Sequence, residues 1–279
     1  MTIKIVADSS ADIKRLEGVE FESVPLKIIT SKKEYVDDKD LDVELMVKEL
    51  SMLNDKSGTA CPSVGDWLSA FGEAQKVFCV TITSGLSGSY NSALIAKSEY
   101  EESYPDREVF VIDSLSAGPE LNLIIEKLKE LILQGKEFSE ICKKITQYQK
   151  HTGLIFMLES LKNLANNGRV SKIVAGAVGI LGIRVVAKAS DKGDIEQLAK
   201  SRGEKNGLIT VFQSMKKFGY CGGKVKIGNC NNKAGAEELV RIIKADFPDA
   251  NTDCYPCGGL CSFYAENGGL LVGFEKGIC

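Results

Sequence analysis

Residues 76–98 read KVFCVTITSGLSGSYNSALIAKS, and this stretch decides the fold class. It opens with an apolar, β-branched run that is typical of a parallel strand buried on both faces. A turn rich in glycine and serine begins at Ser84, and helical spacing of apolar residues resumes after that turn. A strand that passes through a short turn into a helix is the unit from which open α/β sheets are built.

The same unit recurs through the first half of the chain. Further strands are predicted at residues 3–10, 21–30 and 107–114, which read IKIVADSS, FESVPLKIIT and REVFVIDS. Pro25 lies inside the second of these runs, where we expect it at a sheet edge or at the strand entry. We therefore expect residues 1–150 to form an α/β domain with an open, largely parallel sheet and helices on both of its faces.

The pattern changes after residue 150. The expected elements are a strand at 152–158, a helix rich in small residues at 171–182 (SKIVAGAVGILG), an antiparallel hairpin around 191–193 and a closing strand at 268–275. Residues 151–279 are thus predicted to form a smaller α/β domain with a mixed sheet. We expect a ligand in the cleft between the two domains.

Composition and charge exclude several classes of protein. The chain has 279 residues and a formal net charge of −3, which offers no general attraction to nucleic acid or to anionic membrane surfaces. It contains no uncharged apolar run of about 18 residues, so no membrane-spanning helix is expected. The first residues, MTIKIVADSS, form a predicted strand and are too short an apolar segment for a signal peptide. These features predict a cytoplasmic protein without integral membrane association.

Nine cysteines are present, and the odd number favours reduced thiols over a disulfide framework. Cys254, Cys257 and Cys261 have the spacing C-x2-C-x3-C, which could hold a metal. A fourth ligand is missing nearby unless Cys230 or Cys279 folds back. Small apolar thiols are the favoured interpretation, so we expect neither a metal nor another cofactor.

Polar residues gather at the ends of the predicted parallel strands. The segments are Asp8-Ser9-Ser10, Thr83-Ser84-Gly85 and the run from Asp113 to Ser116. In open parallel sheets, ligands bind outside the carboxyl ends of the strands. Each segment alone is more often a cap or a turn, but together they predict a site with many neutral hydrogen-bond donors.

Titratable groups that could support catalysis are scarce. His151 is the only histidine and is remote in sequence from the serine loops, so a serine nucleophile would lack its usual base. Arg169, in NNGRVSK, could grip a carboxylate or phosphate, although a surface arginine is commoner. The sequence therefore favours binding of an anionic head group, and we expect no catalytic residues.

Five motifs occur together in a specific order: ADSSADI, TACPSVGDW, TSGLSGSYNSA, VIDSLSAG and NNGRVSK. In this order and spacing they resemble the DegV family of bacterial fatty-acid-binding proteins, over nearly the whole chain. The resemblance implies two α/β domains that hold a long-chain fatty acid, with the tail buried and the carboxylate near the interdomain cleft. It also implies a partner, because some members present the lipid to the catalytic subunit of a fatty acid kinase, which makes acyl-phosphate for phospholipid synthesis.

The resemblance also implies a set of ligand-binding residues. Ser84 matches the serine that hydrogen-bonds the carboxylate, Thr59 matches the first threonine of the family's T-S-Q-P-S motif, and Arg169 matches an arginine near the head group. Gly85 and Ser116, from the serine-rich loops, complete the expected set together with Tyr264. Tyr264 stands where many members carry a histidine, which puts the nature of the head group or the competence with a kinase in question.

Two other interpretations remain open at this stage. One is a binding module for a small phosphorylated metabolite at the Ser84 turn. The other is a serine hydrolase, or a thiol enzyme that uses Cys61, and the missing histidine partner counts against it. A lipid site needs a deep apolar pocket, whereas a metabolite site needs more cations.

Overall fold

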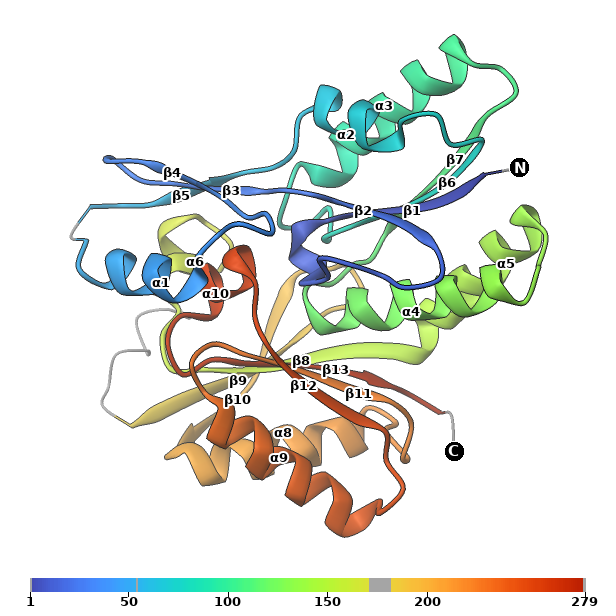
Figure 1. The fold of residues 1–279 in the computed structure, drawn as a ribbon. Coiled ribbons are helices and arrows are strands. Elements are labelled where there is room, and N and C mark those ends of the chain that lie inside the picture. The colour runs from blue at the N-terminus through green and yellow to red at the C-terminus, as the bar shows by residue number, and fades with distance from the viewer. Residues whose placement is uncertain (1, 54, 171–181, 278–279) are drawn as a thin grey trace.

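The computed structural model describes residues 2–53, 55–170 and 182–277 (Figure 1). Its first sheet has the strand order β2-β1-β6-β7, and every neighbouring pair is parallel. The strands are β1 (Ile3–Asp8), β2 (Glu20–Val24), β6 (Lys76–Thr81) and β7 (Glu108–Asp113). The predicted open parallel sheet is therefore confirmed.

Helices cover both faces of this sheet (Figure 1). Helices α2 (Val64–Phe71) and α3 (Ser89–Ser103) lie on one face, and α4 (Pro119–Leu133) and α5 (Phe138–Tyr148) lie on the other. Alternate strand residues serve the two faces, since Val77 packs with the α2 and α3 side chains whereas Phe78 packs with those of α4 and α5. This double burial explains the continuous apolar runs of the strands.

The second sheet is mixed, with the order β10-β9-β8-β13-β11-β12. Its strands are β8 (Thr152–Leu158), β9 (Ile183–Ala189), β10 (Ile195–Arg202), β11 (Val225–Asn229), β12 (Thr252–Pro256) and β13 (Leu270–Glu275). Helices α8 (Glu204–Lys217) and α9 (Lys233–Asp246) cover its outer face, and α4 lies between the two sheets (Figure 1). Gly273 permits this contact, because a Cβ at that position would lie 2.6 Å from the Pro119 carbonyl carbon.

A small third sheet, β4-β3-β5, lies beside the other two. The remaining elements are β3 (Lys27–Ile29), β4 (Glu34–Val36), β5 (Gly58–Ala60), α1 (Val43–Ser51), α6 (Lys162–Asn166), α10 (Gly259–Ala265) and the 3-10 turns η1 (Ser9–Ala11) and η2 (Gln149–His151). Helix α10 packs against α1, α6, β3 and η1, so residues near both ends of the sequence meet here.

Two sequence-based expectations differ from this picture or lie outside it. The prediction of one strand at 21–30 is wrong, because the chain divides at Pro25 into β2 of the first sheet and β3 of the third. Proline lacks a backbone N–H and cannot continue a ladder, which suits a change of sheet. The expected small-residue helix at 171–182 falls almost wholly outside the described residues, and the division into 1–150 and 151–279 stays a prediction.

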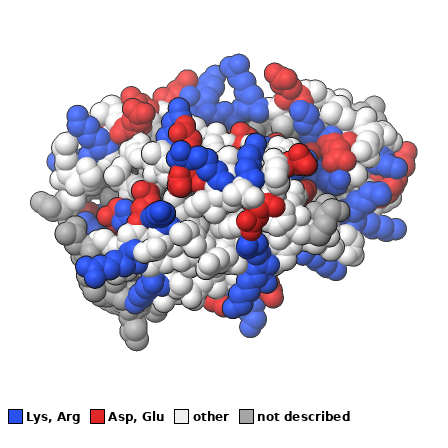
Figure 2. Space-filling model, turned by 90° about the horizontal axis from the view of Figure 1, so that it is seen from below, with Lys and Arg blue, Asp and Glu red and all other residues white. Residues whose placement is uncertain are grey.

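The surface formed by α8 and α9 carries interspersed charges of both signs (Figure 2). Lys216, for example, pairs with Asp246 across the two helices at 2.7 Å. No helix within the described ranges is long and apolar enough to cross a lipid bilayer.

The C-x2-C-x3-C cysteines do not converge on one point. Cys254 is exposed, whereas Cys257 and Cys261 are buried. Within the described part of the chain, no group of three histidine, cysteine or acidic side chains is placed to hold a metal ion. Cys221 is disulfide-bonded, so the expectation of reduced thiols throughout was wrong at that position.

Candidate functional site

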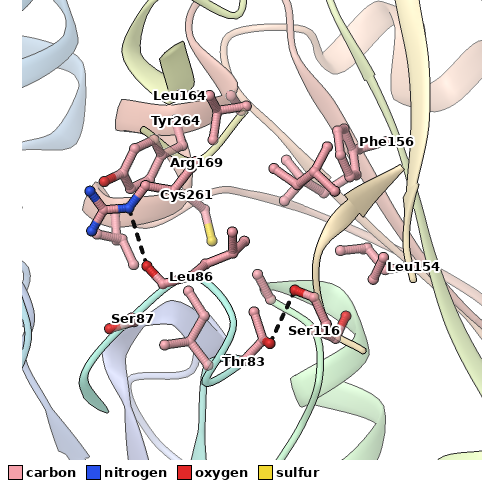
Figure 3. A pocket seen from close by; sticks show the side chains of 18 of the residues that line it. Thr83, Leu86, Ser87, Ser116, Leu154, Phe156, Leu164, Arg169, Cys261 and Tyr264 are labelled. Carbon is pink, nitrogen blue, oxygen red and sulfur yellow. Dashed lines mark hydrogen bonds between the residues drawn. The ribbon is translucent and has the colours of Figure 1, made fainter. Parts of the chain in front are cut away.

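A deep pocket lies between the first and second sheets, with the loops after β6 and β7 on one side and α10 on another (Figure 3). It encloses about 810 Å³ of space between side chains, part of which is open to solvent. Leu154, Phe156 and Leu158 alternate along β8 and face this pocket, while Ile155 and Met157 point to the α8 side of the sheet. The other apolar lining residues are Leu26, Ile82, Leu86, Ala117, Leu164, Ala189, Ile195, Leu260, Cys261, Ala265 and Leu271.

One end of the pocket is polar and is built around Tyr264. The Tyr264 hydroxyl and Thr59 Oγ1 share a hydrogen bond of 2.8 Å. Arg169 lies beside them, with its Cζ 6.0 Å from the centroid of the Tyr264 ring. Burial is the main cause that raises the pKa of Tyr264 above its usual value, so the phenol is neutral near pH 7.

Arg169 is held in place by its own hydrogen bonds. Its Nε donates to the Leu86 carbonyl at 3.1 Å, and its Nη1 donates to the Asn167 carbonyl at 2.6 Å. Leu86 belongs to the loop after β6, so this contact joins the two polypeptide segments across the pocket (Figure 3). Among the described residues that line the pocket, Arg169 is the one cation.

A second polar group, Thr83, lies at the loop that follows β6. Thr83 is 1 % exposed, and its Oγ1 donates to the Gly193 carbonyl at 3.1 Å and accepts from the Gly85 N–H at 3.1 Å. Gly193, in the β9–β10 turn, has φ +78°, and a Cβ there would lie 1.9 Å from Thr83 Oγ1. Only glycine fits this approach, which binds the hairpin turn of the second sheet to a loop of the first.

Ser116 also lines the pocket and is 2 % exposed. Its Oγ makes no hydrogen bond of normal geometry among the described residues, and it lies near the Glu120 carboxylate, whose pKa is raised by burial, an effect only partly offset by this hydroxyl. A buried hydroxyl of this kind is available to a ligand in the pocket.

The sequence-predicted residues divide into two groups. Thr59, Ser116, Arg169 and Tyr264 all line the pocket, as expected. Ser84 and Gly85 do not, and both are exposed. In this loop the backbone N–H of Ser84 donates to Asp113 Oδ1 at 3.1 Å, while the neighbouring Thr83 lines the pocket, so a ligand role for Ser84 and Gly85 stays a prediction.

Asp8, at the end of β1, holds the loop after β6 in place through hydrogen bonds. It is fully buried, and its Oδ2 accepts from the Ile82 N–H at 2.9 Å and from Ser89 Oγ at 2.6 Å. Its Oδ1 accepts from the backbone and the hydroxyl of Ser10. Burial raises the pKa of Asp8, while these hydrogen bonds act in the opposite direction. Asp8 is a structural group, because its described partners lie in η1, just after β6 and at the start of α3.

The hydrolase interpretation lacks its residues in this pocket. Neither His151 nor Cys61 lines it, and His151 is exposed. A serine or cysteine nucleophile needs a base within hydrogen-bond reach, and no histidine is found among the described lining residues. The metabolite interpretation needs several cations, whereas Arg169 stands alone among the described lining residues.

Comparison with known proteins gives a consistent result. A family model described as "Uncharacterised protein, DegV family" matches residues 2–276. The chain belongs to the DegV family. A DegV domain-containing protein of Streptococcus pneumoniae is 45% identical over 279 residues, which cover 99% of each protein.

Solved DegV structures share this fold and carry fatty acids. The fatty acid kinase (Fak) B3 protein of Streptococcus pneumoniae, loaded with linoleic acid, has a TM-score of 0.97 and 45% identity, and covers 99% of this chain and 100% of that one. A DegV family protein of Eubacterium eligens, loaded with heptadecanoic acid, has a TM-score of 0.96 and 44% identity over 99% and 100% of the two chains. The two-domain α/β fold expected from the sequence is therefore confirmed.

Proposed function

We propose that this chain binds one long-chain fatty acid in the pocket between its sheets. The observation that carries the proposal is a deep pocket with a continuous apolar wall and a single described cation, Arg169, at one end. Burying a methylene group is worth about 0.8 kcal/mol, so a tail of about fifteen methylenes contributes about 12 kcal/mol before the costs of association.

The polar end suits a carboxylate. Arg169 supplies positive charge, and the Thr59–Tyr264 pair supplies hydroxyl groups near it. An anion that enters an apolar pocket must keep hydrogen bonds or a counter-charge, and this arrangement offers both. The apolar wall formed by β8 then takes the acyl chain.

The proposal extends to a partner. The Fak B3 protein, 45% identical to this chain, is named for a fatty acid kinase. We propose that this chain likewise presents its acid to a separate kinase subunit that forms acyl-phosphate, and that it has no catalytic activity of its own. This role places it in the cytoplasm, with the nucleotide that such a kinase consumes.

The test is extraction and refilling of the purified protein. Mass spectrometry of organic extracts should find one fatty acid per chain, and delipidated protein should take up acids of roughly 14 to 18 carbons in a calorimetric titration. Ala189→Trp fills the pocket and should abolish uptake, whereas Ala245→Trp, on the exposed face of α9, should not. Native protein that is empty and takes up no acid would refute the proposal. Competition by short phosphate esters would favour a metabolite site instead.

A further inference from the structure

The N-terminus of α10 is held by two carboxyl groups from the beginning of the chain. Asp37 Oδ1 accepts from the Gly259 N–H at 2.7 Å, and Asp37 Oδ2 accepts from the Leu260 N–H at 2.9 Å. Asp12 Oδ1 accepts from the Gly258 N–H at 2.8 Å. The first backbone donors of a helix have no partner within it, and an anion there also meets the positive end of the helix dipole.

The glycines of the CGGLC segment make this contact possible. A Cβ on Gly259 would lie 2.5 Å from Leu41 Cδ2 and 2.7 Å from Asp37 Oδ1, and a Cβ on Gly258 would lie 2.7 Å from Asp12 Oδ1. Any side chain at these positions would push the helix away from the two acids. The glycines between the cysteines thus have a clear structural role.

Helix α10 carries a large part of the pocket wall. Leu260, Cys261, Tyr264 and Ala265 all line the pocket, and the Tyr264 hydroxyl bonds Thr59 at 2.8 Å. The end of α10 is fastened separately, because Asn163 Nδ2 donates to the Phe263 carbonyl at 2.8 Å. The place of the Tyr264 hydroxyl therefore depends on where both ends of this short helix are held.

We propose that Asp37 is a positioning residue for the head-group end of the pocket, acting through α10 on Tyr264. Asp37 is 3 % exposed and accepts from two successive backbone donors, which fixes both the position and the direction of the helix. Asp12 contributes one such bond, and its Oδ2 has no hydrogen-bond partner among the described residues. This inference rests on the proposed fatty-acid function.

The first test compares two ligands that differ only in the head group. Asp37→Asn turns an amide N–H₂ toward one of the two backbone donors, which releases the start of α10 with little change of volume. We expect the preference for a fatty acid over the alcohol of equal chain length to fall about tenfold, with affinity for the alcohol nearly unchanged. Asp42→Asn is the matched control, because Asp42 caps the exposed start of α1 through the Leu45 N–H at 2.9 Å.

A double-mutant cycle then separates positioning from a general loss of stability. In a Tyr264→Phe background, Asp37→Asn should cause no further loss of the preference for the acid. Gly259→Ala displaces the same helix end from the other side and should behave in the same way, which covers the case in which Asp37→Asn does not fold.

Two results would overturn the inference: an unchanged preference in Asp37→Asn, whether or not both affinities fall equally, or additive losses of preference in the double variant. Wild-type protein that binds no acid would refute the proposed function as well. Wild-type protein that prefers the acid while Asp37→Asn keeps the full preference would refute this inference alone.

Discussion

The loop after β6 and the N-terminus of α10 both belong to the pocket wall, and buried carboxyl groups hold both of them in different ways. Asp8 accepts hydrogen bonds from Ser10, Ile82 and Ser89, so both of its oxygens have partners. At α10, Asp12 and Asp37 both accept hydrogen bonds from backbone N–H groups at the start of the helix, and Asp12 Oδ2 has no hydrogen-bond partner among the described residues. The first region is a completed structural network, whereas the second contains Asp12, a half-buried acid with one buried carboxyl oxygen, whose protonation depends on pH.

Loss of the hydrogen bonds to Asp8 should cause the largest effect, a fall in the stability of the fold. Asp8→Ala leaves the Ile82 N–H and the hydroxyls of Ser10 and Ser89 without their acceptor in a buried place. The free energy of unfolding should fall by about 3 kcal/mol or more, as measured by urea denaturation. The exposed helix cap Asp42, changed to Ala, should cost about 1 kcal/mol. Equal losses for the two variants would contradict the role of Asp8.

The next prediction uses the pH dependence of the α10 region. Burial, followed by the nearby Asp37 charge, raises the pKa of Asp12 from 3.8 to about 8. Because Asp12 binds its proton more tightly in the folded than in the unfolded state, protonation of Asp12 stabilises the fold. This contribution is complete below about pH 4 and is lost as the pH rises toward 8. Compared with Asp12→Asn, the wild type should lose stability across this window by up to about 1.4 kcal/mol per pH unit. Parallel stability curves for the two proteins would show that Asp12 is ionised throughout.

A third prediction concerns the charge beside α10. Arg169→Ala removes the one described cation of the pocket and should weaken fatty-acid binding by at least tenfold, with little effect on the alcohol of equal length. Arg202→Ala, on the exposed side of β10, is the control. If Arg169→Ala binds the acid normally but no longer supports acyl-phosphate formation with a cognate kinase, Arg169 serves the interaction with the kinase and not the binding of the lipid.

The smallest expected effect is on fatty-acid affinity and distinguishes Thr83 from Ser84 in the loop after β6. Thr83→Val keeps the shape and removes the hydroxyl that donates to Gly193, so affinity for the acid should fall by about tenfold or less. Ser84→Ala should change it by less than about twofold, because Ser84 is exposed outside the pocket. The reverse order in a titration series would restore Ser84 as the carboxylate ligand.

The same comparison explains what the sequence could reveal. The strand, turn and helix around residues 76–98 are specified locally, by a β-branched run, a glycine-rich turn and helical spacing, so this unit was predicted correctly. The sequence did not single out Thr83, which lines the pocket although its neighbour Ser84 does not, because a single step of backbone direction separates the two. Hydroxyl content alone does not show which side of a turn a residue occupies.

The α10 region could not be predicted in this way. Asp37 bonds Gly259 across 222 residues, and no local pattern announces such a contact. The most visible pattern in residues 254–261 is the cysteine spacing, whereas the glycines inside that segment make the close contact with Asp12 and Asp37. The prediction of one strand at 21–30 failed for a related reason, because two successive strands that belong to different sheets read as one apolar run in the sequence.

The contacts of Asp12 and Asp37 with α10 join residues 246 and 222 positions apart, so they form only when distant parts of the chain meet. The parallel sheet lies within residues 3–113, so it can form while α10, at 259–265, is still without structure. Until α10 docks, both acids face water and are ionised near pH 7. Docking buries Asp12 at a pKa of about 8, so it draws a proton from solution. Docking of α10 is therefore coupled to proton uptake by Asp12, and it becomes less favourable as the pH rises toward 8.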